Sequence, residues 1–182
     1  MRPSTLLAPL AALAALALPV QHVQAQQAPT TGWRAEFLAV MAAAEEKYVK
    51  LAEATPAEKL NWRPAPGVRS IAEVYLHIAG ANYGLVGRLG GAMPTGVDLA
   101  NIEKSTTDKA TIVRHVRASF AHFRAAVVAF PEAEAEKMVP LFGGQQVTAR
   151  HFLTFIADHN GEHLGQSIAY ARMNGIVPPW SM

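Results

Sequence analysis

Four long segments of this chain carry apolar residues at the spacing of an α-helix, and no run alternates convincingly between apolar and polar residues. Three of the segments are residues 33–54, 70–89 and 108–130. The fourth begins after Thr148, which we expect to be its N-cap, and extends to Met173. Apolar residues three or four apart form a stripe that a helix must bury against other elements. Four such helices usually bury their stripes against one another. We therefore predict an all-α, up-down four-helix bundle.

Caps and breakers set the expected helix ends. Ser70 and Glu73 form a capping box, so the second helix starts there. Thr55, read as an N-cap before Pro56, opens a short turn rather than extending the first helix. Residues 92–106 contain proline, glycine and several hydroxyl residues, and are long enough to cross one end of a bundle. We expect them to form the crossover connection between the second and third helices.

The first 25 residues are expected to lie outside this bundle. Arg2 provides a short positive region, residues 5–20 form a run rich in leucine and alanine, and Val23-Gln24-Ala25 has the small-residue spacing of a signal-peptidase site. We interpret residues 1–25 as a cleaved secretory signal peptide, with an uncleaved anchor as the alternative. The remaining residues, 26–182, have a length that suits a single domain.

Composition limits the partners and the compartment. The chain has no cysteine, and therefore no disulfide and no thiol of its own. Its net charge is +2, and Arg114, Arg117 and Arg124 alternate with apolar residues as on a solvated helix face, so we expect no nucleic acid partner. No segment after the signal suits a membrane span. We expect a periplasmic or secreted protein with no membrane association after cleavage.

His159 and His163 provide the first indication of chemistry. At 100° per residue they share one direction with apolar and aromatic neighbours of the fourth helix, including Phe152, Phe155 and Met173. Two imidazoles that point into a core need partners for their ring nitrogens and compete for the same space. A bound divalent cation would satisfy both requirements.

A third ligand is harder to find among the other histidines. His22 lies in the signal, His115 and His122 lie about 100° from the apolar stripe of their helix and are expected in solvent, and His151 begins the fourth helix. This leaves His77, at the edge of the apolar face of the second helix and near small residues. The alternative is that the histidine pair is incidental or satisfied within the core.

Two stretches of sequence resemble a known family. The first comprises Trp62-Arg63-Pro64-Ala65-Pro66-Gly67, Ser70-Ile71-Ala72-Glu73 and His77-Ile78. The second comprises residues 159–166 and 170–181. Together, and in this order, they resemble the second helix, fourth helix and tail of the DinB-like metalloproteins, from about Trp33 to the C-terminus.

The resemblance implies an up-down four-helix bundle with a crossover, often dimeric, in which His77, His159 and His163 bind a metal ion. Three histidines with open positions suit a catalytic site, whereas a structural zinc site has four protein ligands. Three imidazoles suit zinc, nickel, iron or copper. Of these we expect zinc or nickel.

Other polar residues near these histidines have alternative explanations. Glu162 could be a general base or part of a solvated helix flank. Asn82 and Gln166 fall on core-facing stripes and could contact a substrate or bond the backbone. Glu73, one turn before His77, could accept its second ring N–H, although helix capping already accounts for this residue.

These observations leave three functions open. The first is a metal-dependent enzyme acting on a small molecule, of hydrolase or thiol S-transferase type, the latter known among characterised relatives. The second is a periplasmic module that binds a metal or small ligand without turnover. The third is a purely structural bundle, which the intact ligand set argues against. By resemblance we expect a homodimer.

Overall fold

A computed structural model of the chain describes residues 27–181. The proposed signal peptide lies outside the described residues. Four helices dominate: α1 (Gly32–Ala54), α2 (Ile71–Leu85), α3 (Lys109–Ala129) and α4 (Ala149–Met173). The prediction of an all-α four-helix bundle is therefore confirmed. Within residues 27–181, no helix is long and apolar enough to cross a membrane.

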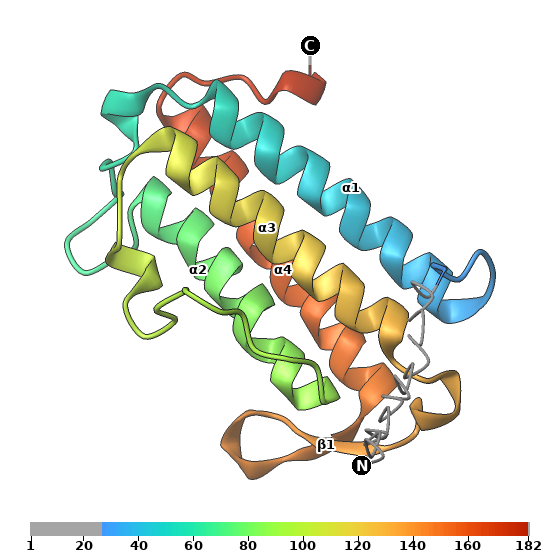
Figure 1. Ribbon diagram of the computed structural model, residues 1–182. Coiled ribbons are helices and arrows are strands. Elements are labelled where there is room, and N and C mark those ends of the chain that lie inside the picture. Colours follow the sequence, from blue (N-terminus) through green and yellow to red (C-terminus); the bar gives the residue numbers. More distant parts are fainter. Residues whose placement is uncertain (1–26, 182) are drawn as a thin grey trace, which may run out of the picture.

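The four helices pack in an order that differs from their order in the chain. Helix α1 packs against α3 and α4, and α2 also packs against α3 and α4, so α1 and α2 occupy opposite corners. Helices α2 and α3 run in the same direction, which requires the connection between them to return along the bundle (Figure 1). Residues 90–108 make this crossover, and the 3₁₀ turn Ile102–Lys104 within it packs on α2. This packing brings the crossover to the site described below.

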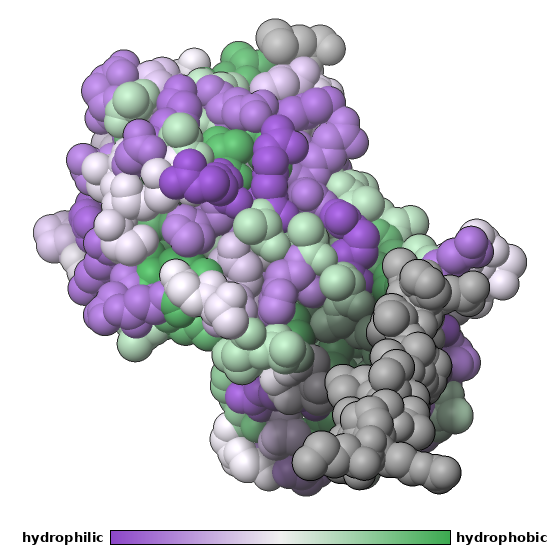
Figure 2. All heavy atoms as spheres, viewed as in Figure 1, coloured by the Kyte–Doolittle hydropathy of each residue, from purple (hydrophilic) through white to green (hydrophobic). Residues whose placement is uncertain are grey.

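The buried face of each helix follows the sequence pattern. In α3 the whole predicted stripe is buried: Ile112, Val116, Phe120, Phe123 and Val127. The capping box at Ser70 is present, because its side chain accepts from the Glu73 backbone and the Glu73 carboxylate accepts from the Ser70 N–H. The Thr148 side chain caps α4 by accepting from the His151 N–H. On the face seen in Figure 2, polar and apolar residues are interspersed.

Two local predictions, on Thr55 and Met173, were wrong. Thr55 is the C-cap of α1, and its hydroxyl donates to the Leu51 carbonyl instead of capping a new turn. The predicted end of the second helical segment at Leu89 was right, because a 3₁₀ turn, Val86–Leu89, continues α2 beyond Leu85. Met173, expected in the core, is 64% exposed because it lies in the last turn of α4, where the bundle ends.

A short hairpin between α3 and α4 was not predicted. Strands β1 (Met138–Pro140) and β2 (Gln146–Thr148) pair antiparallel. Each has only three residues, which is too short for alternation to be visible in the sequence. The hairpin is attached to the bundle through buried Val139, and its tip carries Phe142. This tip helps to line a cavity beside the histidines.

Candidate metal centre

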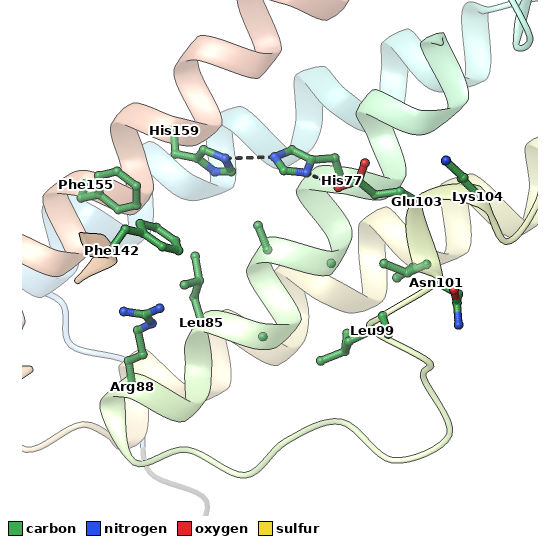
Figure 3. A pocket seen from close by; sticks show the side chains of 15 residues that line it. His77, Leu85, Arg88, Leu99, Asn101, Glu103, Lys104, Phe142, Phe155 and His159 are labelled. Atoms are coloured by element: carbon green, nitrogen blue, oxygen red, sulfur yellow. Dashed lines mark hydrogen bonds and ion pairs between the residues drawn. The ribbon is translucent and has the colours of Figure 1, made fainter. Parts of the chain in front are cut away.

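Three imidazoles from two neighbouring helices converge between α2 and α4. His77 comes from α2, and His159 and His163 come from successive turns of α4. Each offers one ring nitrogen, and these three atoms lie within 4.8 Å of one another. The Nε2 atoms of His77 and His159 are 3.2 Å apart and face each other (Figure 3). All three side chains are partly buried.

Glu103 fixes the orientation of His77. Its Oε1 lies 2.6 Å from His77 Nδ1, and Arg69 donates two hydrogen bonds to the same carboxylate, at 2.8 and 3.1 Å. With Nδ1–H donating to a carboxylate, a neutral imidazole keeps its lone pair on Nε2. That lone pair is directed toward the other two rings. The expected partner, Glu73, is instead bonded to Ser70 and Arg63.

His163 has an analogous partner within its own helix. Its Nδ1 lies 2.7 Å from Gln166 Oε1, and Gln166 Nε2 donates to the Tyr170 hydroxyl at 3.0 Å. This leaves His163 Nε2 available. His159 differs, because its Nδ1 is buried and has no hydrogen-bond partner among residues 27–181. Its ring stacks on Phe155, with centroids 6.0 Å apart and planes 20° apart.

Burial favours the neutral form of two of these imidazoles, His77 and His159. Desolvation lowers the pKa of His77, outweighing the opposite effect of the hydrogen bond to Glu103. The pKa of His159 falls to about 4, mainly through desolvation and further through the neighbouring His163 and His77. Burial alone would raise the pKa of Glu103, but hydrogen bonds from Arg69 and His77 hold it below its ordinary value. Glu103 is therefore an anionic acceptor beside the neutral His77 ring.

This donor set fits a divalent cation. Metal ions bind the lone pair of neutral imidazole, and the outer ring nitrogen commonly donates to a carboxylate or carbonyl. Two nitrogens bound to one tetrahedral ion at about 2.05 Å would be roughly 3.3 Å apart. The separation of 3.2 Å between the His77 and His159 Nε2 atoms is close to that value. His77, His159 and His163 could thus hold a metal ion.

The weaker candidates lie in different environments. Glu162 is exposed on the flank of α4, and Gln166 is the hydrogen-bond partner of His163. Asn82 is fully buried one turn beyond the site, where its Oδ1 accepts from Asn160 Nδ2 at 3.2 Å. Asn82 therefore joins α2 to α4 within the core and does not line the cavity.

The prediction that His115 and His122 face solvent was wrong. Both are half-buried on α3, where their rings pack against Tyr83 of α2 at centroid distances of 6.4 and 5.8 Å. Both side chains do lie off the apolar stripe of α3, as the helical angle predicted. They are nevertheless half-buried, because Tyr83 of the neighbouring helix α2 covers that side of α3. His151 is exposed in the first turn of α4.

A cavity of about 620 Å³ opens beside the histidines. Its volume is within the range of small-molecule sites. Helix α2 contributes the small residues Gly80, Ala81 and Gly84, and the crossover contributes residues 99–104. Phe155 and the hairpin residue Phe142 add two aromatic rings to the lining. His77, His159 and Glu103 also line it, so the histidine cluster borders a space that a small molecule could enter.

Together, the bundle and the cluster define a helical protein with a potential three-histidine metal site. The chain belongs to the DinB superfamily, which matches residues 40–167, a range that contains the three histidines and Glu103. The fold is similar to the crystal structure of a DinB-like protein from Bacillus cereus, with a TM-score of 0.68 and 22% sequence identity. That similarity covers 79% of this chain and 93% of the other. The comparison with curated proteins gave no match.

Glu103 was not identified from the sequence. It lies 26 residues after His77, in a connection with no regular period, and its neighbours give no motif. The only available signal was an acidic residue in a long crossover beside a helix with small residues on one face. The apolar cavity was likewise hidden, because four separate segments contribute to it.

Proposed function

We propose that the protein is a metal-dependent enzyme acting on a small molecule, with His77, His159 and His163 as the ligands of a divalent cation. The observation that carries this proposal is the position of the cluster at the wall of the cavity. Sites that only stabilise a fold are closed by four protein ligands, whereas catalytic sites keep a position open toward the substrate. Three protein ligands beside a cavity match the second arrangement.

The protein residues have distinct tasks in this proposal. Glu103 and Gln166 hold Nδ1 of His77 and His163, which keeps both Nε2 lone pairs directed inward. Phe155 stacks on His159 and limits rotation of its ring. A bound divalent cation would supply Lewis-acid activation of a carbonyl, or of a nucleophile such as water or a thiol. Hydrolysis and thiol S-transfer are the reaction types that we propose.

A non-catalytic binding module is the second candidate, and one observation favours it. Among residues 27–181, Glu103 is the only carboxylate that lines the cavity, and it is already bonded to His77 and Arg69 with a lowered pKa. A general base needs a free acceptor with a pKa near the working pH. The described part of the cavity thus offers no independent carboxylate base, and turnover would depend on the bound cation.

A metal analysis followed by an activity panel separates these candidates. Protein purified without chelators is analysed for zinc, nickel, iron and copper, and is then tested against esters, amides, and electrophiles supplied with a thiol. We expect about one zinc or nickel ion per chain and turnover that His163→Ala abolishes. Metal without turnover would favour the binding module. Absence of metal binding after incubation with each ion would reject both.

We also propose that the chain is exported and acts as a soluble periplasmic or secreted homodimer. Export is supported by the order of Arg2, the apolar run and Val23-Gln24-Ala25, and the dimer by the resemblance alone. Mass spectrometry of exported protein should find a chain that begins at Gln26. Sedimentation of the purified protein measures its assembly, and an intact Met1 in a membrane fraction would contradict cleavage.

A further inference from the structure

One wall of the cavity is a row of rings that begins at the metal centre. The His159 imidazole stacks on Phe155, and Phe155 packs on Phe142 with ring centroids 5.7 Å apart. The Arg88 guanidinium carbon lies 4.7 Å from the centroid of the Phe142 ring. Leu85 and Leu99 add further apolar lining. The cavity wall thus connects the histidine cluster to a guanidinium through two aromatic side chains.

Arg88 is a cation without an acidic partner. All 14 Asp and Glu residues of the chain lie within residues 27–181, and none forms an ion pair with Arg88 there. One guanidinium nitrogen, Nη1, donates to the Pro140 carbonyl of β1. The Nε–Nη2 edge has no hydrogen-bond partner among these residues. Two parallel N–H donors on such an edge match the two oxygens of a carboxylate.

The guanidinium is also held in place before any ligand arrives. Figure 3 shows the Arg88 side chain extending from the 3₁₀ turn after α2 toward Phe142, near Leu85. The contact with the Phe142 ring and the hydrogen bond to Pro140 connect it to the hairpin. Fixing a side chain in its binding conformation reduces the entropy lost when a ligand binds. Arg88 is therefore suited to bind an anion at a defined distance from the histidines.

We propose that the ligand of this cavity is an amphiphilic carboxylate: its reacting group lies at the histidine cluster, its apolar or aromatic body along Phe155 and Phe142, and its carboxylate on Arg88. This inference deepens the proposed function and rests on it for the position of the reacting group. The carboxylate site itself depends only on Arg88 and the apolar wall. Arg88 is thus a specificity-determining residue of the chain.

Within the described part of the chain, Lys104 is the other Lys or Arg that lines the cavity, but its setting is different. It belongs to the crossover and follows Glu103, at the end of the cavity near His77 (Figure 3). Its side chain is exposed and is not connected to the row of rings. A carboxylate on Lys104 would leave the apolar wall between Phe155 and Phe142 unused. The two cations therefore predict different binding positions, which substitutions can separate.

Two matched pairs of biphenyl probes test this proposal with the full chain. Biphenyl-4-carboxylate and biphenyl-4-carboxamide are titrated by calorimetry into metal-free protein, where no ion can attract the carboxylate. The same protein loaded with Zn²⁺ receives 4′-(mercaptomethyl)biphenyl-4-carboxylate and its amide, whose thiol engages the ion. We expect each carboxylate to bind about tenfold more tightly than its amide, because a charge-assisted bidentate contact is lost in the amide.

Substitutions show which side chain causes the preference for the carboxylate over the amide. Arg88→Gln should abolish it, Arg88→Lys should retain a reduced preference, and Lys104→Gln and the exposed Arg114→Gln should leave it intact. Unchanged Zn²⁺ stoichiometry in Arg88→Gln shows that the bundle is still folded. Equal binding of acid and amide, or a preference that survives Arg88→Gln, overturns the proposal. If Zn²⁺ fails to bind while the Arg88-dependent preference persists in metal-free protein, the proposed metal function fails and the carboxylate site stands.

Discussion

Glu103 Oε1 lies 2.6 Å from Nδ1 of His77, and this contact ties the crossover to the metal centre. The carboxylate is itself held by two hydrogen bonds from Arg69. The connection between α2 and α3 therefore takes part in positioning a ligand contributed by α2. The site depends on the path of the crossover as well as on the helices.

Removing this carboxylate should weaken metal binding without unfolding the bundle. In Glu103→Ala, Nδ1 of His77 loses its acceptor, so the ring can rotate or place its proton on the ligating nitrogen. Loss of such an outer partner typically reduces metal affinity about 10- to 100-fold. Calorimetric titration with Zn²⁺ measures the change. Glu162→Ala, which removes an exposed carboxylate beside His163, is the matched control and should bind Zn²⁺ like the wild type.

Each of the three histidines should be required for stoichiometric metal binding. His77→Ala, His159→Ala and His163→Ala each leave two imidazoles, which hold a divalent ion poorly. The helical signal in circular dichroism should remain, because the caps and apolar stripes are intact. The increase in thermal stability that Zn²⁺ gives the wild type should disappear.

His115→Ala is the matched control for this series. It removes a half-buried imidazole that packs on Tyr83, so it should lower the thermal stability while one Zn²⁺ still binds per chain. Tight one-to-one Zn²⁺ binding by His77→Ala would reject the three-histidine site.

The helices could be predicted because the sequence signals that specify them come from residues close together in the chain. In α3, five apolar residues at helical spacing indicated the buried face, and the capping box at Ser70 marked the start of α2 within one residue. The pair His159 and His163 was recognisable for the same reason, since one turn of helix separates them. Such features depend on residues three or four apart.

The remaining parts of the site depend on contacts that no local pattern encodes. Glu103 reaches His77 only because the crossover returns along α2, and Phe142 reaches Phe155 only because a hairpin of two three-residue strands carries it there. His115 and His122 were misplaced because Tyr83, on another helix, covers them. Helical periodicity gives the direction of a side chain but not what packs against it.

The capping box of α2 should make stability depend on pH. The backbone N–H of Ser70 lowers the pKa of Glu73, and Arg63 lowers it further. Since the folded pKa lies below the ordinary glutamate value of 4.5, the ionised cap stabilises the fold above that pH. This contribution is lost as the pH falls through the folded pKa. Glu73→Ala should therefore reduce the free energy of unfolding by about 1 kcal/mol at pH 7.

Urea unfolding at pH 7 and pH 3 tests this expectation. The difference between Glu73→Ala and the wild type should shrink at the lower pH. Glu58→Ala removes an exposed carboxylate in the 3₁₀ turn Ala57–Lys59 and serves as the control. If Glu73→Ala lowers the free energy of unfolding by the same amount at both pH values, packing and not the charged cap accounts for the loss.

Two glycines of α2 offer a test of how closely the crossover must approach the metal centre. A Cβ added at Gly80 would lie 2.7 Å from Ile102 Cγ2, a distance that requires movement, whereas one at Gly84 would lie 3.8 Å from Leu99 Cδ1 in ordinary contact. Alanine in a helix is favoured over glycine by about 1 kcal/mol. Gly84→Ala should therefore stabilise the protein by roughly 0.5–1 kcal/mol.

Gly80→Ala should have the opposite effect, because Ile102 is β-branched and has few rotamers with which to avoid the new methyl group. Overpacking of this kind typically costs about 1–3 kcal/mol, which exceeds the gain in helix propensity. Displacement of Ile102 also moves the adjoining Glu103 away from His77, so Zn²⁺ affinity should fall as in Glu103→Ala. Urea unfolding and Zn²⁺ calorimetry on both variants measure the two effects. If Gly80→Ala binds Zn²⁺ as tightly as Gly84→Ala, the crossover does not control the position of His77.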